Sequence, residues 1–418
     1  MGGLSYLKLF FISSLVMAMG AYFTACAVEG GSSGTGSNLS SISSSGSSLS
    51  GSSSGSSSNT FAAGIGGAGQ VNTAHFLFGI QVPGGTPVPA KINSGGTLTG
   101  SRVGMTTGIQ ANNPRNAAID PTGTFLYQAA QPGIWGYKID RSTGNITQMP
   151  NTPFASTQNV DTIAIDQRGK FLYAFGGGEV FAYSLQAGTG QLTAVPGSPF
   201  MAGPATQTFG PTNRLAVDQT NKFLYVSAST GLIGFAIDAA TGALTMVSGS
   251  PFGSTVKSAY SIVVVPTNHL YEATYSTTNA SNGIFGYSID PTTGTLTSLA
   301  GSPFDVACGN AINMTAPAQG NLMFAGGCGM FRVSPTSGAL TRVANDPGDV
   351  GVGDWPVFDP TGKLLWLVTN DVNCWHCDTG VSAYRVNPTT GTLTLVPNSF
   401  FVMQNGFSGA IISIAITQ

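Results

Sequence analysis

A unit of 44 to 53 residues recurs seven times along this 418-residue chain, and it limits the fold more than any other feature. Its first signature is a turn followed by an aliphatic residue and Thr, as in Thr241-Gly242-Ala243-Leu244-Thr245. The seven copies occupy residues 95–99, 143–147, 189–193, 241–245, 293–297, 337–341 and 390–394. A second signature, an aromatic and aliphatic run, recurs in step with the first at residues 76–78, 125–127, 171–173, 223–225, 269–271, 322–324 and 364–366. Such a fixed period indicates an array of equivalent structural units.

Each repeat contains four short segments with strand character, separated by turns. In the second copy these are residues 117–119, 125–129, 134–139 and 146–149. Four strands in a repeat of roughly 40 to 50 residues are typical of a β-propeller blade. We therefore predict an all-β fold, a seven-bladed β-propeller with four-stranded blades. The first copy lacks its leading strand, and residues 410–416 form a strand with no partner after it. We expect this C-terminal strand to complete the N-terminal blade.

The N-terminal region predicts export and a lipid anchor. Residues 9–19 form an apolar run that is shorter than the ~20 residues of a membrane-spanning helix, as in a signal peptide. The small residues Thr24 and Ala25 before Cys26 resemble the bacterial lipobox, in which the Cys becomes the lipidated N-terminus; an ordinary cleaved signal is the alternative. We assign residues 1–25 to the signal peptide, 26–72 to the lipidated Cys and a flexible Ser/Gly-rich linker, and 73–418 to the propeller.

The composition limits the classes of partner that the chain can bind. Charged residues make up 8% of the chain and the net charge is −2, so the chain lacks the basic surface that nucleic-acid binding requires. We expect a monomer that contacts the membrane through its lipid, at the outer membrane or the cell surface. We expect no cofactor and no metal.

The repeated pattern Ile-Asp-x-x-Gly-x-Phe-Leu-Tyr, followed by Gly-Tyr-x-Ile-Asp-x-x-Thr-Gly-x-Leu-Thr, resembles the seven-bladed propellers of the lactonase family. These are related to 6-phosphogluconolactonases and to the YVTN-repeat surface propellers. The resemblance covers residues 73–418, and it implies a propeller fold and a lactone hydrolase activity. The matching residues are turns and strand cores, so the resemblance assigns no catalytic residue in this chain.

Propeller ligands usually bind at the mouth of the central channel, where the innermost strands begin. Counting back from the aromatic runs places seven candidates there, namely Arg115, Asp161, Arg214, Tyr260, Asn313, Asp354 and Trp355. Convergent polar groups in a concavity favour a ligand site. Asp161 or Asp354 could act as a general base, with Arg115 or Arg214 holding a carboxylate or an oxyanion. The alternative is that these groups cap loops and pair with one another. Trp375 and His376, in the long loop 369–380, complete the predicted mouth.

Four cysteines remain after Cys26. Cys308 and Cys328 lie in loops at the same end of one predicted blade, and Cys374 and Cys377 lie in the equivalent loop of the next. An exported chain with an even number of cysteines favours two disulfides. A zinc site that draws on both pairs with His376, or a redox pair, is the alternative.

Two functions fit this sequence. The first is a binding or interaction module that contacts a glycan, a protein or a small molecule through its mouth. The second is an exported lactone hydrolase, which the family resemblance implies. A propeller hosts many unrelated functions, so the fold alone does not choose between them.

Overall fold

The protein is described by a computed structural model, whose chain divides into two units, Met1–Ala68 and Gly69–Gln418. The structure describes parts of the second unit only, namely residues 75–82, 87–93, 95–100, 114–154, 159–203, 213–253, 258–275, 283–304, 313–344, 355–370, 378–405 and 410–417. The predicted signal peptide, Cys26 and the linker therefore lie outside the described residues. Within the described ranges, no helix is long and apolar enough to cross a membrane.

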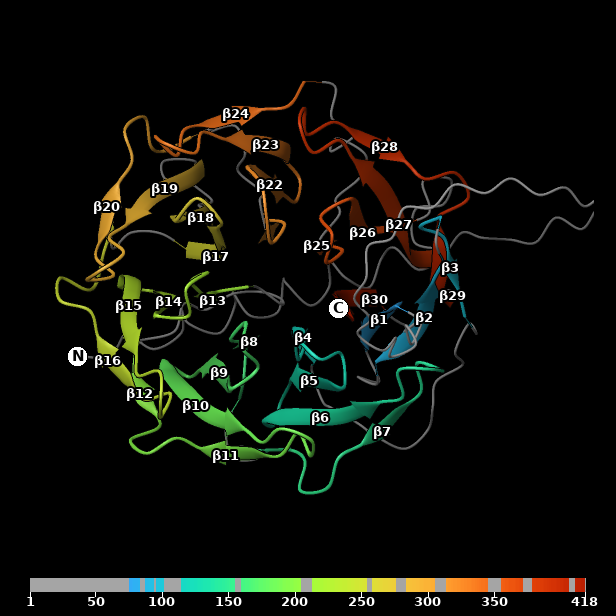
Figure 1. Cartoon of the computed structure of the whole chain (residues 1–418), viewed down its shortest axis with the longest axis horizontal. Coiled ribbons are helices and arrows are strands. Elements are labelled where there is room, and N and C mark those ends of the chain that lie inside the picture. The colour runs from blue at the N-terminus through green and yellow to red at the C-terminus, as the bar shows by residue number, and fades with distance from the viewer. Residues whose placement is uncertain are drawn as a thin grey trace, which may run out of the picture. The chain divides into compact units, whose positions relative to one another are not determined.

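The second unit is an all-β, seven-bladed propeller, as predicted (Figure 1). Seven antiparallel sheets stand in a ring, and the first strand of each sheet lies nearest the centre. Blade 1 consists of β30 (Ala410–Ile416), β1 (His75–Val82), β2 (Val88–Ile92) and β3 (Leu98–Thr99). Blade 2 consists of β4 (Ala117–Ile119), β5 (Phe125–Ala129), β6 (Ile134–Ile139) and β7 (Ile146–Gln148). The four strands predicted for this repeat are thus confirmed.

The remaining blades repeat this plan. Blade 3 contains β8 (Thr162–Ile165), β9 (Phe171–Gly176), β10 (Glu179–Leu185) and β11 (Leu192–Ala194), and β12 (Phe200–Met201) also pairs with β10. Blade 4 contains β13 (Leu215–Val217), β14 (Phe223–Ala228), β15 (Gly231–Ile237) and β16 (Leu244–Met246). Blade 5 contains β17 (Ser258–Val265), β18 (His269–Tyr275), β19 (Gly283–Ile289) and β20 (Leu296–Ser298). Blade 6 contains β21 (Met314–Thr315), β22 (Leu322–Ala325), β23 (Gly329–Val333) and β24 (Leu340–Arg342). Blade 7 contains β25 (Pro356–Phe358), β26 (Leu364–Asn370), β27 (Asp378–Val386) and β28 (Leu393–Leu395), and β29 (Phe401–Asn405) also pairs with β27.

The C-terminal strand closes the ring, as predicted. β30 pairs antiparallel with β1 and supplies the innermost strand of blade 1. The two ends are also joined outside the ladder, because Phe76 N donates to Thr417 Oγ1 at 2.9 Å and Thr417 N donates to Phe76 O at 2.9 Å. Closure removes the open edges that a linear array of sheets would expose.

The hydrophobic core is divided among the seven blade interfaces. Each of seven buried apolar clusters joins residues of two consecutive blades, and one of them joins blade 7 to blade 1. Burial of apolar surface between blades is the main stabilising contribution in such an arrangement.

The two repeated signatures meet across these interfaces, which explains why they recur in step. Tyr225 of blade 4 donates from its hydroxyl to the carbonyl of Gly294 in the Thr-Gly turn of blade 5, at 2.8 Å. The ring of Phe223 packs against the same glycine, which has φ +75° and whose missing Cβ leaves room for that ring. Equivalent Tyr-to-Gly hydrogen bonds run from Tyr127 to Gly190, from Tyr173 to Gly242 and from Tyr271 to Gly338.

Candidate functional site

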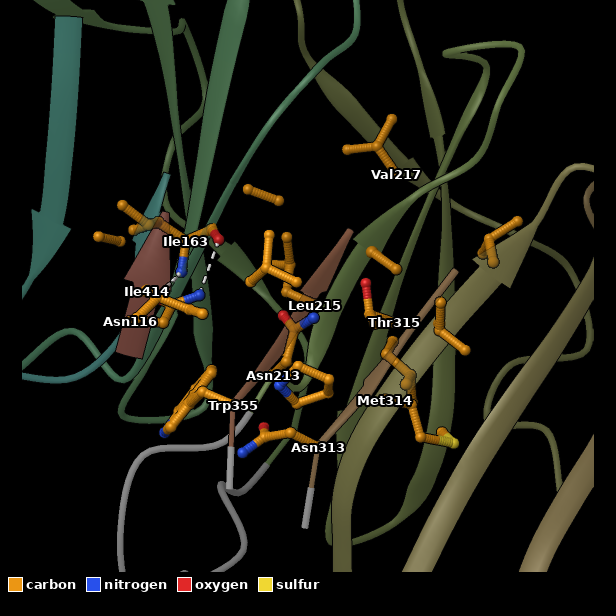
Figure 2. Close-up of a pocket in the computed structure, with 18 residues that line it drawn as sticks. Asn116, Ile163, Asn213, Leu215, Val217, Asn313, Met314, Thr315, Trp355 and Ile414 are labelled. Carbon is orange, nitrogen blue, oxygen red and sulfur yellow. Dashed lines mark hydrogen bonds between the residues drawn. The ribbon is translucent and has the colours of Figure 1, made fainter. Parts of the chain in front are cut away.

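The central channel contains a cavity of about 280 Å³ that the innermost strands of all seven blades line. Most of its lining residues are aliphatic, among them Ile163, Leu215, Ile262, Met314 and Ile414, but polar atoms make up about half of the exposed wall. Figure 2 shows Asn213, Asn313 and Trp355 gathered at one end, while Val217 lies toward the other. Each of these polar residues lies one or two residues before an innermost strand, so this end is the predicted mouth. A concave apolar cavity with a few converging polar groups is the usual form of a small-molecule site.

Asn116 lines the cavity but uses its amide to join two blades. Its Nδ2 donates to Thr162 Oγ1 and to Ile163 O at 3.1 Å each, and its Oδ1 accepts from Ile163 N at 2.9 Å. With these bonds the side chain fixes the start of β8 against the start of β4. Ser261 acts similarly between blades 5 and 6, because its hydroxyl accepts from Met314 N at 3.0 Å. These two residues hold the mouth in shape rather than facing a ligand.

Beside the mouth lies an ion pair that joins blades 3 and 4. Arg214 Nη2 donates to Asp161 Oδ2 at 3.0 Å. The Arg214 side chain is 1% exposed, while that of Asp161 is 23% exposed, so solvent reaches the carboxylate and not the guanidinium. Arg214 also lies over the ring of Phe175, with 5.4 Å between the guanidinium carbon and the ring centroid. This stacking and the ion pair compensate part of the cost of burying the charge.

The electrostatics of Arg214 involve a second arginine. Burial lowers the pKa of Arg214, the Asp161 carboxylate raises it, and the nearby positive charge of Arg115 lowers it. Arg214 still remains cationic at neutral pH, because the pKa of arginine begins far above neutrality. Within the described part of the chain, Arg115 forms no ion pair of its own. This group of two arginines and one carboxylate therefore carries one excess positive charge.

The structure places some of the predicted mouth residues together and leaves others out. Asn313 and Trp355 line the cavity and are almost fully buried, at 2% and 6% exposure. Arg115, Asp161 and Arg214 lie at the same ends of the innermost strands but do not line the cavity. Tyr260 lies in β17, and nothing is described of its side chain. The remaining predicted residues, Asp354, Trp375 and His376, lie outside the described residues.

Of the four cysteines predicted to form disulfides, one is described. Cys328 is buried and disulfide-bonded. Cys308, Cys374 and Cys377 lie outside the described residues, so both predicted pairings remain predictions. Among the residues that the structure describes, no group of three or more His, Cys, Asp or Glu side chains could hold a metal ion.

Two cavity-lining asparagines escaped the sequence prediction. Asn213 lies next to Arg214 and Asn116 lies next to Arg115, so each was one residue from a predicted position. Adjacent residues on a strand point to opposite faces, and the sequence did not show which member of each pair turns toward the channel. An Asn one or two residues before an innermost strand in three blades was the available signal.

Comparisons with known proteins show the fold and no more. No family model and no curated protein matches the sequence. Among solved structures, the chain is similar to a protein of Bacteroides fragilis whose 6-phosphogluconolactonase name is provisional, with TM-score 0.59, 14% identity and coverage of 84% of this chain and 100% of that one. A Bacteroides uniformis protein with the same provisional name gives TM-score 0.58, 17% identity, and 80% and 98% coverage. A protein from Lactobacillus plantarum gives TM-score 0.54, 18% identity, and 82% and 99% coverage.

The propeller fold predicted from the repeats is thereby confirmed, since these solved structures cover 80% to 84% of this chain. Sequence identities below 20% do not carry an activity from one propeller to another.

Proposed function

We propose that this protein is an exported, lipid-anchored propeller that binds a small hydroxylated carboxylic acid at the mouth of its channel. One observation supports this most strongly: the polar end of a 280 Å³ cavity carries two amides and an indole, next to a cluster with an excess positive charge. Amides bond both hydroxyl and carboxylate oxygens, and the indole offers a flat apolar face with an N–H donor. The cavity is of a size for a small molecule rather than a protein segment.

Binding to the full chain can be tested by calorimetry with a panel of aldonic acids, with neutral sugars of the same size as a control. We expect the acids to bind and the neutral sugars to bind less tightly. Asn213→Ala should weaken binding on the order of tenfold, because one hydrogen bond to a charged group is lost. Gln219→Ala is the matched control, since Gln219 lines a different cavity that shares Thr315 and Val357 with the mouth cavity. Equal effects of the two substitutions, or no binding across the panel, would contradict the proposal.

A lactone hydrolase is the second candidate, and the Asp161–Arg214 pair favours it. In such a reaction Asp161 would take a proton from water while the water oxygen bonds to the lactone carbonyl carbon. The ring C–O bond then breaks, and the ring oxygen leaves as a hydroxyl after taking up that proton. A cation near the carbonyl oxygen would stabilise the negative charge that develops there. The products, hydroxy acids, belong to the class proposed as ligands.

Hydrolysis can be measured with a panel of sugar and aliphatic lactones. Turnover by the full chain that falls by at least a hundredfold in Asp161→Asn would support the hydrolase. If there is no turnover above the buffer rate, the hydrolase is contradicted and binding remains as the proposed function. Because Asp161→Asn also breaks an ion pair, the folded state of the variant is checked by circular dichroism at the assay temperature.

Export and anchoring rest on Cys26 and the apolar run before it. The disulfide bond of Cys328 fits an oxidising compartment, and we propose Cys308 as its partner. Mass spectrometry of the mature protein should find acyl chains on Cys26, and Cys26→Ala should move the protein from the membrane to the soluble fraction. A peptide map without reduction should show Cys308 linked to Cys328; a link from Cys328 to another cysteine would contradict the pairing.

A further inference from the structure

The interface between blades 5 and 6 contains a histidine at a position where four other blades have phenylalanine. His269 begins β18 and is 6% exposed. It packs against Gly338 in the Ser-Gly turn of blade 6, because a Cβ on that glycine would lie 2.9 Å from His269 Nε2. Phenylalanine rings pack in the same way on the turn of the following blade at four other interfaces, namely Phe76, Phe125, Phe171 and Phe223. Blades 5 and 6 therefore bury a titratable ring where those blades bury an uncharged one.

The surroundings of the imidazole suit its neutral form. Its Nδ1 lies 2.9 Å from Thr267 Oγ1 in the preceding turn. Leu299 packs against the same glycine, and the hydroxyl of Tyr271 donates to Gly338 O at 2.6 Å. Protonation places an N–H on both ring nitrogens, and within the described part of the chain Nε2 has no acceptor. A protonated ring would thus keep a charge and an unsatisfied donor at the interface.

The turn of blade 6 lacks the carboxylate found in the turn of blade 5. Asp290 begins the blade 5 turn, and Ser334 begins that of blade 6, since the N–H of each donates to the carbonyl of the residue five positions later. Burial raises the pKa of Tyr225 in blade 4, and the charges of Asp218 and Asp290 raise it further. A carboxylate at the start of this turn therefore acts across the blade interface, and blade 6 offers His269 none.

The strands of blade 5 supply no counter-charge either. Val265 on β17 and Ser288 on β19 lie directly opposite His269 in the register, and both are uncharged. Glu272 lies on the same strand as His269, but its carboxylate turns to blade 4, where it accepts from the Ser227 hydroxyl at 2.9 Å.

On the side of blade 6, the charged group that faces blade 5 is a cation. Arg342 lies opposite Phe331, which belongs to the apolar cluster between blades 5 and 6. Burial lowers the pKa of His269. A histidine whose pKa is lower in the folded state stabilises that state fully above its unfolded pKa of about 6.5, and this contribution is lost as the pH falls below that value.

We propose that the interface between blades 5 and 6 is an acid-sensitive joint, which loosens when His269 takes up a proton. The equivalent positions at the other six interfaces hold Phe or Leu, so mild acid acts on this interface alone through that position. The turn of blade 6 then separates from β18 while the remaining interfaces stay packed, as in the local opening of a folded protein. This joint is independent of the ligand proposed for the mouth, and either proposal can fail without the other.

Hydrogen exchange of the full chain, measured by mass spectrometry at about pH 7.5 and about pH 5.5, tests the joint. The turn at residues 334–339 is compared with the turn at residues 290–295 of blade 5 in the same sample, which cancels the effect of pH on the intrinsic exchange rate. We expect protection of the blade 6 turn to fall relative to that of blade 5, on the order of tenfold for each unit by which the pKa of His269 is lowered. Equal changes in the two turns would overturn the proposal.

Two variants and one control assign the effect to the imidazole. His269→Phe copies blade 4 and should abolish the relative loss of protection. Ser334→Asp supplies the carboxylate that blade 5 has at this position, and it should remove roughly half of the loss or more, because an opposite charge favours the protonated ring. His75→Phe, at an exposed histidine of blade 1, should leave the loss unchanged. A loss that persists in His269→Phe, or one that Ser334→Asp does not reduce, would contradict the proposed joint.

Discussion

At the scale of single residues, the two members of the Asp161–Arg214 pair play unequal roles. The carboxylate is partly open to solvent, whereas the guanidinium is buried over Phe175. Removal of the carboxylate would leave the buried cation without this ion-pair partner. Removal of the cation would leave a carboxylate that water can still reach. The pair is therefore a structural requirement of the interface between blades 3 and 4, whatever reaction or ligand the mouth serves.

This asymmetry predicts a non-additive mutant cycle. Asp161→Asn should lower the free energy of unfolding by roughly 2 to 4 kcal/mol, because Arg214 then remains buried without its counter-charge. Arg214→Met in the Asp161→Asn background should recover at least half of that loss, since an apolar side chain suits the site. Urea denaturation of the wild type, the single variants and the double variant measures the cycle. A double variant less stable than Asp161→Asn would contradict this account of the pair.

At the scale of elements, the Thr-Gly turn reverses the chain and also packs against the preceding blade. Gly242 has φ +77°, and a Cβ there would overlap the ring of Phe171 from the preceding blade. Gly188, in the turn of the preceding repeat, has φ +83°, but a Cβ there would meet no atom within 4 Å, so this position isolates the backbone requirement. A comparison of substitutions at Gly188 and Gly242 therefore distinguishes the effect of backbone strain from that of steric overlap.

Substitution of these two glycines should therefore differ in effect. Gly188→Ala should cost about 1 kcal/mol of stability, from the left-handed backbone conformation alone. Gly242→Ala should cost about 3 kcal/mol, because displacement of the Phe171 ring adds to the same strain. Chemical denaturation of both variants provides the measurement. Equal losses would mean that the turn contributes through its backbone only and not through the blade interface.

The acidic residues of these turns predict how the fold responds to acid. Hydrogen bonds from Ser142 and Thr143 lower the pKa of Asp140 to about 2, and similar bonds within their turns lower the pKa of Asp238 and Asp290. A carboxyl whose pKa is lower in the folded state stabilises that state above its unfolded pKa, and the effect is lost as pH falls through the folded pKa. We therefore expect stability to decline between about pH 4 and pH 2.

A triple substitution tests the origin of that decline. Asn387 makes the same turn in blade 7 with hydrogen bonds from Thr389 and Thr390, so Asn fits this position. Replacement of Asp140, Asp238 and Asp290 by Asn should flatten the dependence of the urea midpoint on pH between 2 and 4. An unchanged slope would contradict this origin of the acid sensitivity.

The strands could be predicted from the sequence more completely than the site. The strands were predictable because contacts that recur between blades, such as that of Tyr225 with Gly294, require the two repeated signatures. The mouth was only partly predictable. Asn313 and Trp355 were placed correctly beside the channel, but Asn213 was missed, because a shift of one residue reverses the face of a strand.

At the scale of the whole molecule, stability depends on closure of the ring. Each blade buries its apolar faces against two neighbours, and β30 allows blade 1 to do the same against blade 7. A chain that ends at residue 409 would lack the innermost strand of blade 1 and the bonds between Phe76 and Thr417. We expect this truncation to abolish the cooperative thermal transition.

Removal of residues 1–68 serves as the control, because they lie outside the unit that contains the seven blades. That shorter chain should keep the transition of the full chain, which differential scanning calorimetry can establish. A cooperative transition in the chain that ends at residue 409 would show that closure by β30 is dispensable.

The central claim, that the mouth of the channel binds a hydroxylated acid, is tested most directly by ¹⁹F NMR of the full chain labelled with 5-fluorotryptophan. The chain has four tryptophans, and the Trp355→Phe and Trp366→Phe variants assign the two relevant resonances. Trp355 lines the cavity, whereas Trp366 is fully buried in the cluster between blades 7 and 1. Titration with gluconate should shift the Trp355 resonance in a saturable manner and leave that of Trp366 in place. A Trp355 resonance that does not move while the acid binds would contradict the proposed site.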